Sequence, residues 1–168
     1  VLEELAYARS IHVEELLYKL KDKARELGLR LTGAAFPYPL SRYVGQDPGV
    51  LKRYLDEVHV MLYHKCPGAA CLNAEIRVLV ETLNRLRLSY PELNEALRRV
   101  MGLKLSTWEL RNIGNGLSLK HVEKLMRINW EVYGDKFSPI LWLDGEVRVK
   151  LEGYRRRYGR LDVFVPRE

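Results

Sequence analysis

The chain has 168 residues, of which 47% are hydrophobic and 30% are charged. These proportions support one hydrophobic core, so they exclude a disordered chain and predict a single domain over residues 1–168. The formal net charge of +6 favours acidic partners only weakly, because the field of surface charges is screened beyond about 8–10 Å.

The first part of the chain predicts two helix–strand units. Apolar periodicity and β-branched runs give the order helix 13–27, strand 29–36, helix 48–57 and strand 58–64. Pro37 and Pro39 exclude a regular element over residues 37–46. Asp47 and Pro48 have the pattern of a helix N-cap followed by proline in the first turn.

The second part continues the alternation after a helical stretch. We expect helices over residues 70–86, from Pro91 onward and over 118–130, then strand 137–143, helix 146–158 and strand 161–165. Ser89 and Ser118 are the expected caps of the second and third of these helices. Residues 101–116 are rich in Gly and Asn, and predict a long loop with at most one short strand.

Strands that alternate with helices predict a parallel α/β sheet with helical crossovers. Two architectures fit, an open doubly wound sheet and part of a (β/α)8 (TIM) barrel. The chain has neither a GxGxxG nor a GxxxxGK[ST] motif, so we expect no nucleotide cofactor. Four strands are half a barrel, and a complete barrel needs at least about 200 residues.

Three features of the sequence bear on the cellular location of the protein: its apolar runs, its N-terminal residues and its cysteines. No apolar run approaches the roughly 18 residues that cross a bilayer, so we expect no membrane partner. The N-terminal VLEELAYARS has no secretory signal and no initiator Met, which favours a processed or excised part of a longer protein. Cys66 and Cys71 are too few for a disulfide framework, so we expect free thiols and a cytoplasmic location. The high charge content suits a thermophile.

Two blocks of sequence and the tail carry a resemblance. GLRLTGAAFPYPLSRYVGQD ends a strand in an aromatic and proline-rich loop, and LDEVHVMLYHKCPGAACLNAE carries Asp56, Met61 and Tyr63 before a Gly-Ala loop. Together they resemble glycosyl-hydrolase-like (β/α)8 barrels, many of them uncharacterised archaeal proteins. The segments FSPILWLD and RLDVFVP look like the last two strands of such a barrel.

The resemblance implies that the chain is the C-terminal half of a barrel, about strands five to eight. It also implies a function, acting on or binding carbohydrate at the carboxyl ends of the strands. The strand that supplies the general acid in retaining enzymes would be missing. The missing N-terminal half would then come from upstream, or a second copy would close the barrel as a homodimer, or the activity is lost. The alternatives are a non-catalytic, self-associating half-barrel and a basic nucleic-acid-binding domain.

Barrel active sites lie at the carboxyl ends of the strands. That rule selects Tyr38, Tyr63, His64, Lys65, Trp142, Asp144, Arg167 and Glu168. Asp144 is the candidate catalytic nucleophile or base, although the resembling enzymes usually have Glu there; its alternative role is the N-cap of the following helix. Tyr63 and Trp142 are candidates to stack on sugar rings, and packing in the barrel core is the alternative.

Four other patterns are weaker candidates, and for all but the loop residues among them we favour a structural explanation. His64, Cys66 and Cys71 could supply three zinc ligands, but their spacing is not standard and we predict no metal. Glu75 could reach the mouth of the site from the first turn of its helix, but a carboxylate suits that turn in any case. Trp108, Glu109 and Asn112 lie in the expected long loop and could line a binding cleft. The basic stretch 154–160 could contact nucleic acid, but it is also the end of a helix, where cations are favourable.

Overall fold

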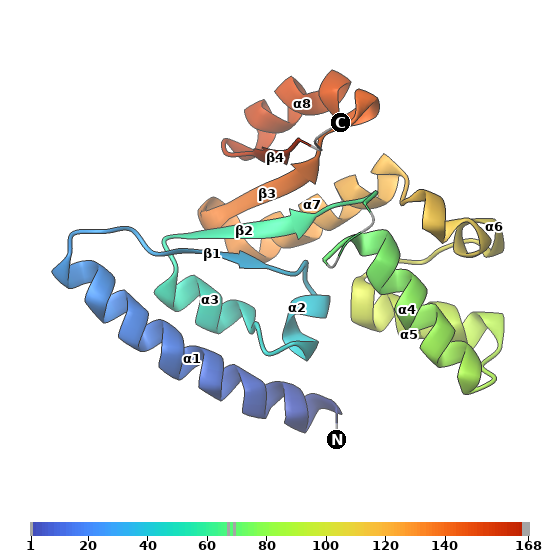
Figure 1. Ribbon diagram of the computed structural model, residues 1–168, viewed down its shortest axis with the longest axis horizontal. Coiled ribbons are helices and arrows are strands. Elements are labelled where there is room, and N and C mark those ends of the chain that lie inside the picture. The colour runs from blue at the N-terminus through green and yellow to red at the C-terminus, as the bar shows by residue number, and fades with distance from the viewer. Residues whose placement is uncertain (1, 67, 69, 166–168) are drawn as a thin grey trace.

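A four-stranded sheet, in which every strand is parallel to its neighbours, organises the fold (Figure 1). The computed structural model describes residues 2–66, 68 and 70–165. The strands lie in the order β1 (Thr32–Ala35), β2 (Glu57–Leu62), β3 (Phe137–Trp142) and β4 (Asp162–Phe164). The α/β class with a parallel sheet is therefore confirmed, and the strand order is compatible with half of an α/β barrel.

The described residues form eight α-helices, α1 (Leu2–Glu26), α2 (Leu40–Tyr43), α3 (Pro48–Tyr54), α4 (Leu72–Arg85), α5 (Tyr90–Met101), α6 (Thr107–Arg111), α7 (Leu119–Tyr133) and α8 (Gly145–Tyr158). Two short 3-10 turns, η1 (Ile113–Asn115) and η2 (Gly134–Lys136), accompany them. The expected cap of α3 is confirmed, because Asp47 Oδ1 accepts hydrogen bonds from the N–H groups of Gly49 and Val50 at 2.8 and 3.2 Å. None of the described helices is long and apolar enough to span a membrane.

Each strand is shorter than predicted, and three other parts of the chain also differ from the sequence prediction. Helix α1 begins at Leu2 rather than at residue 13. Its first turns have little apolar periodicity because small residues such as Ala6 and Ser10 form part of their half-buried side. The predicted loop 101–116 contains α6 and η1. Ser106 caps α6, and the Glu109 carboxylate accepts from the Ser106 N–H at 2.7 Å, which is a capping box. Helix α2 gives the segment 37–46 one helical turn, after a cis peptide bond between Tyr38 and Pro39.

One face of the sheet carries the hydrophobic core. Val58, Val60 and Leu62 of β2 are fully buried and join one cluster with residues of α3, α7 and α8. On β3, Phe137 contacts the rings of Trp130 in α7 and Tyr158 in α8, with centroids 6.4 and 5.7 Å away. Helices before and after β3 therefore pack on the same side of the sheet.

The other face of the sheet, the open face, is less covered. Its side chains alternate with those of the core and come from Thr32, Ala34, Glu57, His59, Met61, Tyr63, Ser138, Ile140, Trp142, Asp162 and Phe164. Apart from Ser138 they are half-buried or exposed. A one-sided helical layer is what half of a (β/α)8 barrel requires, because the other face of the sheet lines the barrel interior.

Candidate functional site

Three contacts on the open face pass over β3 and join residues in or next to β2 to residues in or next to β4. His59 Nδ1 lies 2.7 Å from Asp162 Oδ2, and the rings of Tyr63 and Phe164 are 5.8 Å apart. Arg160, just before β4, donates to Glu57 at 2.9 Å. Strands separated by one neighbour are about 9.5 Å apart in a flat sheet. The side chains of β2 and β4 therefore converge above β3, as they do on the concave side of a curved sheet.

An aromatic cluster occupies the carboxyl end of the open face. Trp142 stacks on Phe164, with ring centroids 5.1 Å apart and planes inclined by 18°, and Tyr63 contacts the edge of Phe164 at 61°. Phe164 is 48% exposed. Burial, and then the charge of Asp162, raise the pKa of Tyr63 above its ordinary value, so its hydroxyl stays protonated and can donate a hydrogen bond.

Three polar side chains, from His64, Lys65 and Asp144, lie just after the carboxyl ends of β2 and β3. Asp144 Oδ2 is 3.0 Å from His64 Nε2 and 3.9 Å from Lys65 Nζ, while Asp144 Oδ1 accepts from the N–H of Val147 at 2.9 Å and caps α8. Burial acts to raise the pKa of Asp144, but the hydrogen bonds from Val147 and His64 and the charge of Lys65 lower it below its ordinary value. Asp144 is therefore an ionised carboxylate at neutral pH.

His64 positions Asp144 and does not itself face a ligand. Its side chain is 4% exposed, and its backbone oxygen accepts from the N–H of Leu117 at 2.8 Å. An ionised carboxylate can only accept, so Nε2 is the nitrogen that carries the proton toward Asp144. The second nitrogen, Nδ1, is buried and has no hydrogen-bond partner among the described residues. The Lys65 side chain is 58% exposed and that of Asp144 is 19% exposed. Of the three side chains in this polar group, a ligand can therefore reach Lys65 and Asp144 but not His64.

The expected carboxyl-end residues are thus brought together only in part. Tyr63, His64, Lys65, Trp142 and Asp144 all lie at the ends of β2 and β3. Tyr38 follows β1, and its N–H donates to the buried Asn129 Oδ1 of α7 at 2.9 Å. Arg167 and Glu168 lie outside the described residues.

Glycoside hydrolysis needs a second carboxylate within about 5–9.5 Å of the first. After Asp144, the carboxylate nearest the carboxyl ends of the strands on the described part of the open face is that of Asp162. In the sheet, Asp162 pairs in register with Ile140. It therefore lies about four residues, or roughly 13 Å at 3.3 Å per residue, below Asp144. His59 and Ser138 already hold Asp162, at 2.7 and 3.1 Å. The geometry supports Asp144 as a ligand-binding carboxylate and gives it no catalytic partner in Asp162.

The expectation of two free thiols is wrong, because Cys66 and Cys71 form a disulfide. The expectation depends on the number of cysteines alone, whereas Cys66 and Cys71 lie with their Cα atoms 5.6 Å apart, within the range that a disulfide spans. A disulfide also removes the thiolates that zinc would need. The described residues contain no group of three His, Cys, Asp or Glu side chains placed to hold a metal ion.

The other candidate residues have intramolecular partners. Glu75 Oε1 accepts from the N–H of Ala70 at 3.2 Å, and Glu109 accepts from His121 at 2.7 Å. In the basic stretch, Arg157 lies over the ring of Tyr158 at 5.6 Å. These contacts give each of the three side chains a partner within the chain.

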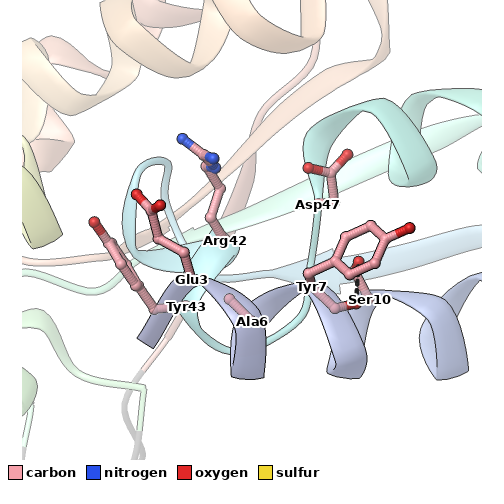
Figure 2. Close-up of a pocket in the computed structure, with 7 residues that line it drawn as sticks. All are labelled: Glu3, Ala6, Tyr7, Ser10, Arg42, Tyr43 and Asp47. Atoms are coloured by element: carbon pink, nitrogen blue, oxygen red, sulfur yellow. Dashed lines mark hydrogen bonds between the residues drawn. The ribbon is translucent and has the colours of Figure 1, made fainter. Parts of the chain in front are cut away.

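The pocket shown in Figure 2 lies away from this site, between α1 and the segment that contains α2. Its lining includes Glu3 and Tyr7 of α1 and Arg42 and Asp47 of that segment. Its volume is about 100 Å³, whereas ligand pockets usually have several hundred Å³. The pocket is too small for an oligosaccharide.

Sequence reasoning missed Phe164 and the group of His59, Ser138 and Asp162. The alternation within LDVFV places Asp162 and Phe164 on one face, and that signal was available. The contacts across β3 were not predictable, since they require the order of the strands. Comparisons of the chain with protein-family models, curated proteins and solved structures gave no significant match.

Proposed function

We propose that this chain is half of a glycosyl-hydrolase-like (β/α)8 barrel and binds carbohydrate at the carboxyl end of the open face. The observation that carries the proposal is the pairing of an aromatic cluster with reachable charged groups at the ends of β2 and β3. Trp142, Tyr63 and Phe164 offer apolar ring surface for a sugar face. Asp144 accepts and Lys65 donates hydrogen bonds to sugar hydroxyls.

The proposed role of this half is binding, with hydrolysis dependent on the other half. Asp144 is ionised, which suits a nucleophile or a base but not the general acid. The acid would come from the half that closes the barrel. An upstream segment would supply it, whereas a second copy of this chain would bring another ionised Asp144 and would close the barrel as a self-associating module without catalysis, which is the alternative.

Binding is tested by titrating oligosaccharides of glucose, mannose, xylose and N-acetylglucosamine while recording heat and tryptophan fluorescence. At least one series should bind, and Trp142→Ala should weaken that binding about tenfold, because it removes a stacking surface worth roughly 1.4 kcal/mol. Trp108→Ala is the matched control, since Trp108 is 72% exposed and belongs to α6. Absence of binding to every series, or equal weakening by both variants, would reject the proposal.

We also propose a cytoplasmic location, which is tested separately. Thiols in that compartment are mostly reduced, so a disulfide there is in exchange with cellular thiols. Rapid alkylation of the source cells before lysis, followed by mass spectrometry of the peptides with Cys66 and Cys71, measures the reduced fraction. A substantial reduced fraction supports the cytoplasm, whereas complete oxidation supports an oxidising compartment.

A further inference from the structure

The two sulfur atoms of the disulfide lie in different surroundings. Cys71 is the N-cap residue of α4, a helix of 14 residues, and is 2% exposed. Cys66 lies in the segment after β2 and is half-buried, with its N–H 3.4 Å from Asn73 Oδ1. The Cα atoms of the two cysteines are 5.6 Å apart. An incoming thiol therefore has better access to Cys66 than to Cys71.

The surroundings also differ in how well they stabilise a released thiolate. The backbone N–H groups of the first turn of a helix and the helix dipole favour negative charge at its N-terminus. A thiolate released from Cys71 lies at that position on α4, and the backbone oxygen of Cys71 accepts the N–H of Glu75 at 3.0 Å. In thiol–disulfide exchange the better-stabilised thiolate is the better leaving group.

We propose that Cys66–Cys71 is a thiol–disulfide exchange site with a fixed direction. The thiolate of a small thiol or of a dithiol reductant attacks Cys66 Sγ, forms a mixed disulfide there and expels Cys71 Sγ as a thiolate. With a dithiol, its second thiolate then releases Cys66, so two electrons pass to the protein and the reductant becomes a disulfide. The proposal is independent of the carbohydrate proposal.

Reduction of the Cys66–Cys71 disulfide changes the covalent structure next to the candidate binding site. Lys65, which faces Asp144, directly precedes Cys66. After reduction the segment is still held by the N–H of Leu72, which donates to the oxygen of Tyr63 at 2.8 Å, and by the contact between Cys66 and Asn73. We expect these contacts to hold the segment in the open form, so that the exchange proceeds without unfolding.

The direction of exchange is tested on the full oxidised chain with reduced glutathione. The reaction is quenched with acid at early times, and peptide mass spectrometry locates the mixed disulfide. Glutathione should be found on Cys66 at least about tenfold more often than on Cys71. Preference for Cys71, or reduction no faster than global unfolding measured by hydrogen exchange, would overturn the proposal.

The role of the α4 N-terminus is tested with a charge change. Glu75 lies in the first turn of α4, where its negative charge opposes a thiolate on Cys71. Glu75→Gln keeps an oxygen acceptor for the N–H of Ala70, and it should accelerate reduction by glutathione about two- to threefold.

Glu81→Gln is the control for this variant, because Glu81 is on the same helix, 63% exposed and paired with Arg77. It should leave the rate of reduction unchanged. If Glu75→Gln is no faster than Glu81→Gln, charge at the α4 N-terminus does not govern the reaction and the proposed leaving group is wrong.

Discussion

Asp144 combines two structural contacts in one carboxylate, since it caps α8 and holds the ring of His64. Asp144→Ala should lower the free energy of unfolding by about 1–3 kcal/mol, because a helix cap is lost and a buried imidazole loses its partner. Asp144→Asn keeps an oxygen for the cap and should cost less. Urea denaturation of the three proteins measures both effects, and equal losses for the two variants would contradict this account.

Glu109 makes stability depend on pH in the acid range. The N–H of Ser106, and then the hydrogen bond from His121, lower the pKa of Glu109 from 4.5 to about 2. The folded state thus binds this proton more weakly than the unfolded state, so the contribution of Glu109 is complete above about pH 4.5 and is lost as the pH falls toward 2.

Glu109→Gln should therefore flatten the decline of unfolding free energy over that range. Urea denaturation at a series of pH values checks the slope for the wild-type chain and the variant. The same slope in both proteins would show that the Glu109 carboxylate gains no net stabilisation in the folded state.

Among the elements, the disulfide joins the segment after β2 to the start of α4, across a sequence separation of 5 residues. Closing so short a ring removes little entropy from the unfolded chain, and the expected stabilisation is about 2 kcal/mol. Denaturation in urea with and without a dithiol reductant should show that loss, with the fold retained. A reduced chain that is unfolded without urea would contradict the expectation.

Much of the element order was predictable because it depends on local chemistry. Asp47 followed by Pro48 marked the start of α3, and Ser89 marked the start of α5. The strands were recognised from their apolar runs, although the structure shortens each of them. Helix α6 was missed since Gly and Asn in the surrounding segment outweighed the capping pattern of Ser106 and Glu109.

The candidate site was less predictable than the elements. The rule about carboxyl ends of parallel strands placed His64 and Asp144 at one edge, but their hydrogen bond depends on side-chain geometry that the rule does not contain. The pairing of His59 with Asp162 joins residues 103 positions apart, and no local pattern links them. The disulfide was missed because a count of cysteines says nothing about the distance between them.

For the whole molecule, the edges of the sheet are the feature with the clearest consequence. Strands β1 and β4 each have one hydrogen-bonded neighbour in the described sheet, and unpaired strand edges favour association. Helix α1 also exposes Leu5, Leu16 and Leu20, at 52, 56 and 43%. Closure of the barrel by a second copy would place α1 of one protomer beside α8 of its partner.

We therefore expect a homodimer of about twice 19.6 kDa in sedimentation equilibrium. Both α1 and α8 end in basic residues, so association should strengthen as added salt screens their repulsion. Ala34→Lys puts a charge on the exposed open face of the edge strand β1 and should give a monomer, while Val78→Lys on α4, at a side chain 55% exposed, should not. A monomer at all salt concentrations would leave closure to an upstream segment.

The contacts that pass over β3 have a kinetic consequence. His59–Asp162 and Arg160–Glu57 link β2 to the β4 side within one chain, so the curvature of the sheet exists before any partner arrives. A binding surface that is already shaped loses little conformational entropy on docking. Completion of the barrel should then proceed as a rigid-body encounter, with an association rate constant of roughly 10⁵–10⁷ M⁻¹s⁻¹ set by orientation rather than by a slow rearrangement.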